Sequence, residues 1–331
     1  MSSAMALVAT GGTIASRFSG EHGGLLSTDG ADVLRGMAGL PDVALRVEEF
    51  CNLGSNLIDL PLALRLSRRI AALLADPDVS GCVVTHGTDT MEESAFLASL
   101  VVGSDKPVAF TGAQFAADSA APDGPANLAS ALLYVAAPEA RGLGPVIVFD
   151  GHAYAAEDAT KIDAQGRAAF DGPHWGSVAR IGSDSVQVTA QVPRREAIDA
   201  AAIVTDVALV PMAMGMGGRF IDGLVAAGAA GIIIEGFGCG NATPAVVAAV
   251  ARARDRGVPT VVTTRCLRGE TRAIYAEGGG LDLRNAGAVL AGRLQGRKAR
   301  ILLALLMAAG ADLTKGFARY QICEDCGAGA A

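Results

Sequence analysis

Residues 83–93 have the sequence Val83-Val84-Thr85-His86-Gly87-Thr88-Asp89-Thr90-Met91-Glu92-Glu93. The apolar, partly β-branched run that begins at Cys82 is typical of a strand covered on both faces. Thr90 and Glu93 have the spacing of a capping box, which predicts a helix from about Met91. Thr88 and Asp89 are therefore expected at the carboxyl end of a strand, where open α/β sheets bind their ligands.

The same order of strand, polar loop and helix repeats on both sides of this stretch. Apolar runs predict strands at residues 5–10, 44–50, 107–111 and 146–149, and helices are expected at 28–37, 59–75, 91–102 and 125–136. Such an alternation predicts a parallel sheet with helices on both faces. Residues 17–24 are polar and rich in glycine and are expected to form a mobile loop.

The alternation is interrupted and then resumes. Residues 152–181 mix polar, β-type, Gly and Pro residues, as expected of a hairpin excursion, and a second α/β unit begins near residue 207. We therefore expect an α/β protein with a larger N-terminal domain, built on a doubly wound and mainly parallel sheet (residues 1–183). A linker (184–206) would join it to a smaller C-terminal α/β domain (207–331), whose last residues, 327–331, are expected to be disordered.

Composition argues against several classes of protein. The 331 residues carry a net charge of −7 without a Lys/Arg block, so nucleic acid is not an expected partner. No apolar run reaches membrane-spanning length, and no signal peptide precedes the first strand, so a cytoplasmic protein is expected. The Gly-x-Gly-x-x-Gly and Walker patterns are absent, and Cys323 and Cys326 form only a lone CxxC, which is half a zinc site.

Five polar side chains are candidates for one cleft at the strand ends: Thr10, Ser55, Thr88, Asp89 and Lys161. A threonine hydroxyl needs a nearby base to act as a nucleophile, and a buried lysine held by a carboxylate can supply one. Backbone N–H groups in glycine-flanked loops can stabilise an oxyanion, so the set fits acyl transfer on a small polar substrate. The alternative is that Thr10 and Thr88 only stabilise turns and that Lys161 is a surface residue.

Two motifs carry a resemblance to a known family. Ala9-Thr10-Gly11-Gly12-Thr13-Ile14-Ala15 and Thr85-His86-Gly87-Thr88-Asp89-Thr90-Met91-Glu92-Glu93 resemble the two signatures of the bacterial-type L-asparaginase/glutaminase family. Further similar segments are Gly54-Ser55-Asn56, Asp123-Gly124-Pro125-Ala126-Asn127-Leu128, Asp158-Ala159-Thr160-Lys161, Gly238-Cys239-Gly240-Asn241 and Lys298-Ala299-Arg300-Ile301-Leu302-Leu303. The likeness extends over nearly the whole chain.

The resemblance implies a cofactor-free and metal-free amidohydrolase that converts L-asparagine to L-aspartate and ammonia. It implies Thr10 as the nucleophile, and Thr88, Asp89 and Lys161 as the triad that handles protons. Asp89 would also bind the substrate α-ammonium and Ser55 its α-carboxylate, and Asn56 stands where the family often has Gln. The backbone of Thr88 and of Ala113 would hold the scissile amide. Family members are usually homotetramers of two intimate dimers, in which Asn241 would reach the neighbouring subunit's site.

The sequence departs from the family at the flexible N-terminal loop, which commonly carries a tyrosine bound to the nucleophile. No tyrosine precedes Tyr134 here, and whether Tyr275 or Glu277 reaches the site is left open. Alternatives are therefore kept: a glutaminase-asparaginase of broad specificity, or an amino-acid-binding or amidotransferase-type protein that hydrolyses nothing alone. His86 is a further candidate base, although a histidine bound to the backbone at a strand end explains it equally well.

Overall fold

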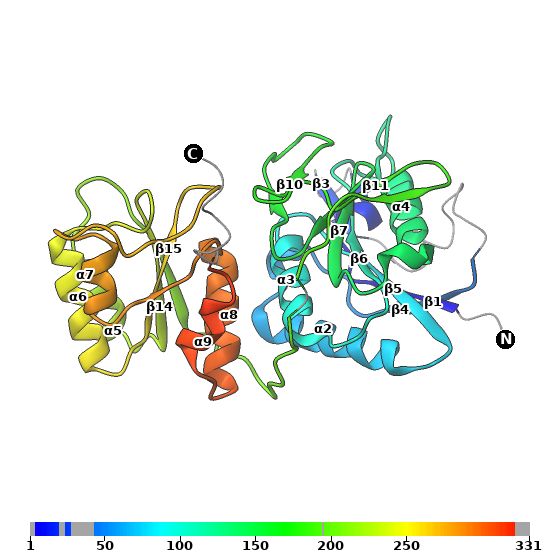
Figure 1. The fold of residues 1–331 in the computed structure, drawn as a ribbon. Coiled ribbons are helices and arrows are strands. Elements are labelled where there is room, and N and C mark those ends of the chain that lie inside the picture. The colour runs from blue at the N-terminus through cyan, green and yellow to red at the C-terminus, as the bar shows by residue number, and fades with distance from the viewer. Residues whose placement is uncertain (1–3, 20–23, 28–42, 194, 322–331) are drawn as a thin grey trace. The chain divides into compact units, whose positions relative to one another are not determined.

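The computed structural model describes residues 4–19, 24–27, 43–193 and 195–321. Within these ranges the chain divides into two compact units, residues 1–197 and residues 198–331 (Figure 1). The expected helix at 28–37, the CxxC residues Cys323 and Cys326, and the tail expected to be disordered lie outside the described residues. None of the described helices combines the length and the apolar character needed to cross a membrane.

The N-terminal unit is built on a mixed, mainly parallel sheet with the strand order β12-β11-β8-β7-β6-β5-β1-β4. Its parallel strands are β1 (Ala4–Ala9), β4 (Leu45–Glu49), β5 (Val79–Thr85), β6 (Val108–Thr111) and β7 (Pro145–Phe149). Three antiparallel strands extend it: β8 (His152–Ala155), β11 (Ala179–Ile181) and β12 (Val186–Val188). Strand β12 falls inside the stretch expected to be a linker.

Helices cover both faces of this sheet, as the alternating strand and helix segments predicted. Alternate residues of β1 enter different cores: Leu7 packs with α4 (Gly124–Ala136), whereas Val8 packs with α2 (Leu60–Ala75) and α3 (Met91–Val101). Figure 1 shows α4 on one side of the sheet and α2 and α3 on the other. Because the side chains of residues 5–9 of β1 are all buried on one face or the other, this part of the strand is expected to tolerate no polar residue.

The carboxyl ends of β1 and β5 are where the direction of winding changes. Strand β4 pairs with one edge of β1, and the chain then crosses over to place β5 on the other edge. Helices on the two sides of such a point leave a crevice outside the strand ends, which is the usual ligand site of open α/β sheets. A two-stranded hairpin, β9 (Thr160–Lys161) with β10 (Phe170–Asp171), carries Lys161.

Two local expectations were wrong. The segment expected to be a mobile loop contains strand β2 (Ser16–Ser19), which pairs with β3 (Gly24–Ser27) around residues that are not described. Helix α3 does begin at Met91, but Thr90 forms no capping bond, because its hydroxyl donates to the carbonyl of Ser55 at 2.7 Å. By contrast, Asp59 caps α2 as expected, accepting from the backbone N–H of Leu62 at 2.8 Å.

The C-terminal unit has a four-stranded parallel sheet in the order β13-β14-β15-β16. Its strands are β13 (Val207–Pro211), β14 (Gly231–Gly236), β15 (Thr260–Thr264) and β16 (Val289–Leu290), and its helices are α5 (Arg219–Ala226), α6 (Pro244–Asp255), α7 (Gly280–Asn285), α8 (Gly296–Ala308) and α9 (Leu313–Ala318). Figure 1 shows α5, α6 and α7 on one face of this sheet and α8 and α9 on the other. In the N-terminal unit, short 3₁₀ turns occur at Thr13–Ala15, Ser55–Leu57 and Pro138–Ala140. The fold is thus the two-domain α/β arrangement expected from the sequence.

Candidate active site

A pocket of about 520 Å³ lies at the strand ends of the N-terminal unit. This volume is in the range of small-molecule sites. Its walls come from the turn after β1, the segment before α2, the loop after β5, the exit of β6 and the β9–β10 hairpin. The lining residues are Gly12, Thr13, Ser16, Gly54, Ser55, Asn56, Leu57, Gly87, Thr88, Asp89, Gln114, Lys161 and Ala164.

Lys161 connects two of the predicted catalytic residues. Its ammonium donates to the hydroxyl of Thr88 at 2.9 Å and to the carboxylate of Asp89 at 2.8 Å. The Lys161 side chain is largely buried, whereas that of Asp89 is 66% exposed and leaves one carboxylate oxygen for another cation. The three residues therefore form a short hydrogen-bonded chain from an open carboxylate to an enclosed hydroxyl.

The backbone of Lys161 is fixed by a buried carboxylate on α3. Its N–H donates to Oε2 of Glu92 at 2.6 Å, and Glu92 is only 2% exposed. A hydrogen bond to a charged acceptor is shorter and stronger than one between neutral groups. The first turn of α3 thus holds the hairpin that carries the lysine, a role that Glu92 was not given from the sequence.

The structure does not place Thr10 in the pocket. Its side chain is fully buried, and its hydroxyl donates to the carbonyl of Thr85 at 2.9 Å. The backbone N–H of Thr10 binds the same carbonyl at 3.1 Å, so this residue still belongs to the pairing between β1 and β5. The expectation that Thr10 is the nucleophile is therefore corrected: its hydroxyl faces the protein interior.

Thr13 is the threonine of this motif that lines the pocket. Gly11 and Gly12 have φ angles of +97° and +84°, which turn the chain away from the direction of β1 before Thr13 starts a 3₁₀ turn. Among the described residues, the Thr13 hydroxyl has no hydrogen-bond partner. The glycine pair in the sequence could have indicated that Thr13 lines the pocket, because the residue that follows such a turn no longer pairs with the neighbouring strand.

Both glycine loops are needed for the walls to meet. A Cβ atom on Gly12 would lie 2.5 Å from Cα of Gly87, and one on Gly87 would lie 2.7 Å from Oγ of Ser55. Real Cβ atoms essentially never lie so close to other atoms. The turn after β1 therefore packs against the backbone of the loop after β5, and this loop packs against the side chain of Ser55. This packing places the hydroxyls of Thr13, Ser55 and Thr88 around one small space.

The predicted substrate-binding residues divide between the two units. Ser55 and Asn56 line the pocket, and the hydrogen bond from Thr90 to the Ser55 carbonyl holds their turn against the start of α3. Ala113 is buried at the exit of β6, beside Gln114, which does line the pocket. Asn241 lies in the C-terminal unit after β14, where its side-chain oxygen accepts from the N–H of Gly280 at 3.3 Å.

His86 is a structural residue of the loop after β5. Its ring is fully buried, and Nδ1 donates to the carbonyl of Gly87 at 2.8 Å. Burial lowers the pKa of His86 from 6.5 to about 4, because the charged ring would lose its hydration, although the bond to Gly87 partly opposes this. The His86 ring is neutral and does not line the pocket. His86 is therefore better explained as a histidine bound to the backbone at a strand end than as a catalytic base.

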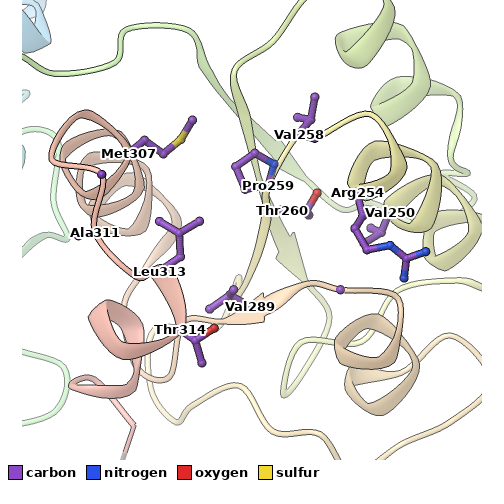
Figure 2. Close-up of a pocket in the computed structure, with 13 residues that line it drawn as sticks. Val250, Arg254, Val258, Pro259, Thr260, Val289, Met307, Ala311, Leu313 and Thr314 are labelled. Carbon is purple, nitrogen blue, oxygen red and sulfur yellow. The ribbon is translucent and has the colours of Figure 1, made fainter.

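The C-terminal unit contains a larger hollow of about 650 Å³ at the amino ends of β15 and β16 (Figure 2). Its lining is mainly apolar, with Val250, Val289, Met307 and Leu313 among its residues. The guanidinium of Arg254 at its edge is bound to Asp255 and to the carbonyl of Ala286. None of the described side chains that line it is arranged to exchange a proton with another, so the chemistry belongs to the N-terminal pocket.

The hydroxyl of Thr13 lies in one pocket with the hydrogen-bonded chain of Thr88, Lys161 and Asp89, which is an arrangement suited to acyl transfer. Comparison with known proteins identifies the class as the amidohydrolases. The model "Asparaginase, N-terminal" matches residues 4–194, and the model "Glutaminase/Asparaginase C-terminal domain" matches residues 206–316. The chain belongs to the asparaginase family.

Individual relatives agree with this assignment. An L-asparaginase of Bacillus licheniformis is 33% identical over 93% of this chain and 96% of its own. A glutaminase-asparaginase of Pseudomonas fluorescens is 29% identical over 89% of this chain and 84% of its own. The crystal structure of a probable cytoplasmic L-asparaginase from Campylobacter jejuni superposes with a TM-score of 0.85 at 26% identity, covering 96% of this chain and 99% of that one.

Proposed function

We propose that this amidohydrolase converts L-asparagine and water to L-aspartate and ammonia, with Thr13 as the nucleophile. The observation that carries the proposal is the placement of Thr13 on the wall of the same pocket as Lys161, Thr88 and Asp89. The names of the relatives support the substrate, because an L-asparaginase matches nearly the full length of the chain.

The reaction has two halves that share one acyl-enzyme. In the first, the oxygen of Thr13 attacks the side-chain amide carbon of asparagine, and the C–N bond breaks as the nitrogen takes up a proton and leaves as ammonia. In the second, water attacks the resulting ester and releases aspartate, and the proton returns to Thr13. The chain of Lys161, Thr88 and Asp89 supplies and accepts these protons, since its ammonium and hydroxyl are already hydrogen-bonded.

The substrate's own charges match the walls of the pocket. Asp89 binds the α-ammonium through its exposed carboxylate, and Ser55 binds the α-carboxylate through its hydroxyl, with Asn56 beside it. The backbone of Thr88 and of Ala113 holds the scissile amide while the carbon is attacked. The shorter side chain of Asn56, where the family often has Gln, makes the enzyme's contact with the α-substituents weaker.

We further propose that the enzyme is a cytoplasmic homotetramer of two intimate dimers. Support comes from the family and from the structural neighbour of Campylobacter jejuni, which is named a probable cytoplasmic L-asparaginase. In this assembly Asn241 of one subunit contacts substrate in another. Sedimentation velocity at several concentrations tests the assembly, and a monomer that is fully active would overturn it.

A glutaminase-asparaginase of broad specificity is the second candidate, favoured by the name of the Pseudomonas fluorescens relative. The test is ammonia release by the purified protein with L-asparagine and with L-glutamine, compared as kcat/KM. A preference for asparagine supports the proposal, and comparable values support the alternative. Stabilisation of the protein against heat by L-aspartate, without any ammonia release from either amide, would instead indicate a binding protein.

A further inference from the structure

Gln114 is an uncharged side chain that bridges three walls of the pocket. It follows β6, and its backbone N–H donates to Oδ2 of Asp123 at 3.0 Å, while the next N–H, that of Phe115, donates to Oδ1 at 2.9 Å. The Asp123 carboxylate at the start of α4 thus anchors the backbone of this segment. Because the backbone is held at two points, the side chain of Gln114 leaves it in a defined direction.

The orientation of the Gln114 amide follows from its partners. On one side Nε2 donates to the carbonyls of Asp163 and Gly166, at 3.4 and 3.2 Å. Carbonyl oxygens can only accept, so the NH₂ group must face them and Oε1 must face the opposite side. There Oε1 accepts from the hydroxyl of Thr88 at 3.0 Å.

This orientation sets the direction of the hydrogen bonds at Thr88. The hydroxyl has a single proton, which it gives to Gln114, so it can only accept from the ammonium of Lys161. The order of donation therefore runs from Lys161 to Thr88 to Gln114. Without Oε1, the Thr88 hydroxyl would be free to rotate and to present its proton elsewhere.

Gln114 also ties the lysine-bearing hairpin to the loop after β5. Asp163 and Gly166, whose carbonyls bind Nε2, follow Lys161 in the same hairpin. The side-chain amide of Gln114 therefore holds both the hydroxyl of Thr88 and the hairpin that carries Lys161.

We propose that Gln114 is a positioning residue: by accepting the proton of the Thr88 hydroxyl, it keeps a lone pair of that oxygen directed at the ammonium of Lys161 for the reaction. This inference rests on the proposed amidohydrolase function of the same pocket. Gln114 acts through Thr88 and not through the substrate, so its loss should slow the chemical steps and leave substrate binding almost unchanged. An error of 1 Å in the placement of catalytic groups costs on the order of 100-fold in rate.

The test is Gln114→Met, which keeps the length of the side chain and removes both the acceptor and the donor. We expect kcat for asparagine to fall at least tenfold, while KM and the Kd for L-aspartate by calorimetry change less than twofold. A rise in KM and Kd at constant kcat would overturn the inference, because Gln114 would then contact substrate. Unchanged kinetics would overturn it as well.

A matched control separates orientation of Thr88 from simple fastening of the hairpin. Arg167 donates to the carbonyl of Ala121 and lies over the ring of Phe115, so Arg167→Met loosens the same hairpin without touching Thr88. We expect this variant to keep kcat within twofold. If it lost as much kcat as Gln114→Met, fastening alone would explain both results and the inference would fail.

The failure of this inference differs from a failure of the proposed function. If the unmodified protein released no ammonia from any amide, the function itself would be wrong. If it turned over asparagine and Gln114→Met did so equally well, only the role of Gln114 would be lost.

Discussion

Thr10 donates its hydroxyl to the carbonyl of Thr85, 75 residues further along the chain, at 2.9 Å. This buried bond joins β1 to β5 at the level where the pocket begins, and it occupies the only proton of the hydroxyl. In the Thr10-Gly11-Gly12-Thr13 motif, Thr10 therefore stabilises the strand pairing beneath the pocket, and Thr13 lines the pocket.

The two threonines should respond oppositely to mutation. Thr13→Ala is expected to abolish ammonia release while the free energy of unfolding stays within about 0.5 kcal/mol, since a half-exposed hydroxyl contributes little to stability. Thr10→Val should keep kcat within tenfold and lose about 0.5–1.5 kcal/mol, because the Thr85 carbonyl loses one of its two donors and keeps the backbone N–H of Thr10. Urea unfolding and an ammonia assay measure both effects. An active Thr13→Ala protein would remove Thr13 from the reaction.

Lys161→Met should lower kcat by several orders of magnitude with the fold intact. The substitution removes the only ammonium bound to Thr88 and Asp89 among the described residues, and no other described group replaces it as a proton carrier. Lys106→Met is the matched control, since that ammonium donates to the carbonyl of Asp76 and does not line the pocket. A loss below about tenfold, or roughly 1.4 kcal/mol of barrier, would exclude Lys161 from proton transfer.

Glu92→Gln should weaken the hairpin that carries Lys161. The backbone N–H of Lys161 would then bind a neutral amide in place of a buried carboxylate, which makes a weaker hydrogen bond. We expect kcat to fall several-fold and the free energy of unfolding to fall by about 1 kcal/mol, because the amide oxygen of Gln still accepts from this N–H. Unchanged values for both would show that Glu92 does not hold the lysine.

The larger elements of this fold could be predicted because their signals are local. Asp59 and Pro61 mark the start of α2, and the apolar runs of β1 and β5 are long enough to require burial on both faces. The hairpin of β2 and β3 was missed because each strand has only four residues and neither shows a clear apolar run, so only their pairing with each other identifies them.

The site was harder to predict than the fold, because side-chain direction depends on contacts between distant segments. Lys161 lies near Thr88 only because a hairpin folds back across 73 residues. Thr90 was expected to cap α3, but its hydroxyl donates to the carbonyl of Ser55 instead. Thr10 and Thr13 have the same chemistry, and only the positive φ angles between them decide which one reaches the pocket.

The pH dependence of stability should contain a contribution from His86. The pKa of this ring falls to about 4 in the folded protein, so the unfolded chain binds the proton more tightly. Stability from this source is complete above pH 6.5 and is lost as the pH falls toward 4, by about 3 kcal/mol in all. Urea unfolding should show a flatter profile for His86→Asn over this window, with His152→Gln unchanged as the control. Parallel profiles for all three proteins would exclude this contribution.

Gly12→Ala tests whether contact between the two glycine loops forms the pocket. The new methyl carbon would lie 2.5 Å from both Cα and N of Gly87, in a backbone with a φ of +84°. Gly142 has a similar φ of +79° with nothing within 4 Å, so Gly142→Ala measures the strain of a positive φ without a clash, about 1–2 kcal/mol.

We expect Gly12→Ala to lose at least about 2 kcal/mol more than this control, since neither loop can move without disturbing Thr13 or Thr88. Its kcat should fall at least 100-fold, whereas Gly142→Ala should keep the activity of the unmodified enzyme. Equal losses of stability in the two variants, with full activity in both, would mean that the loops separate freely and that their contact does not define the site.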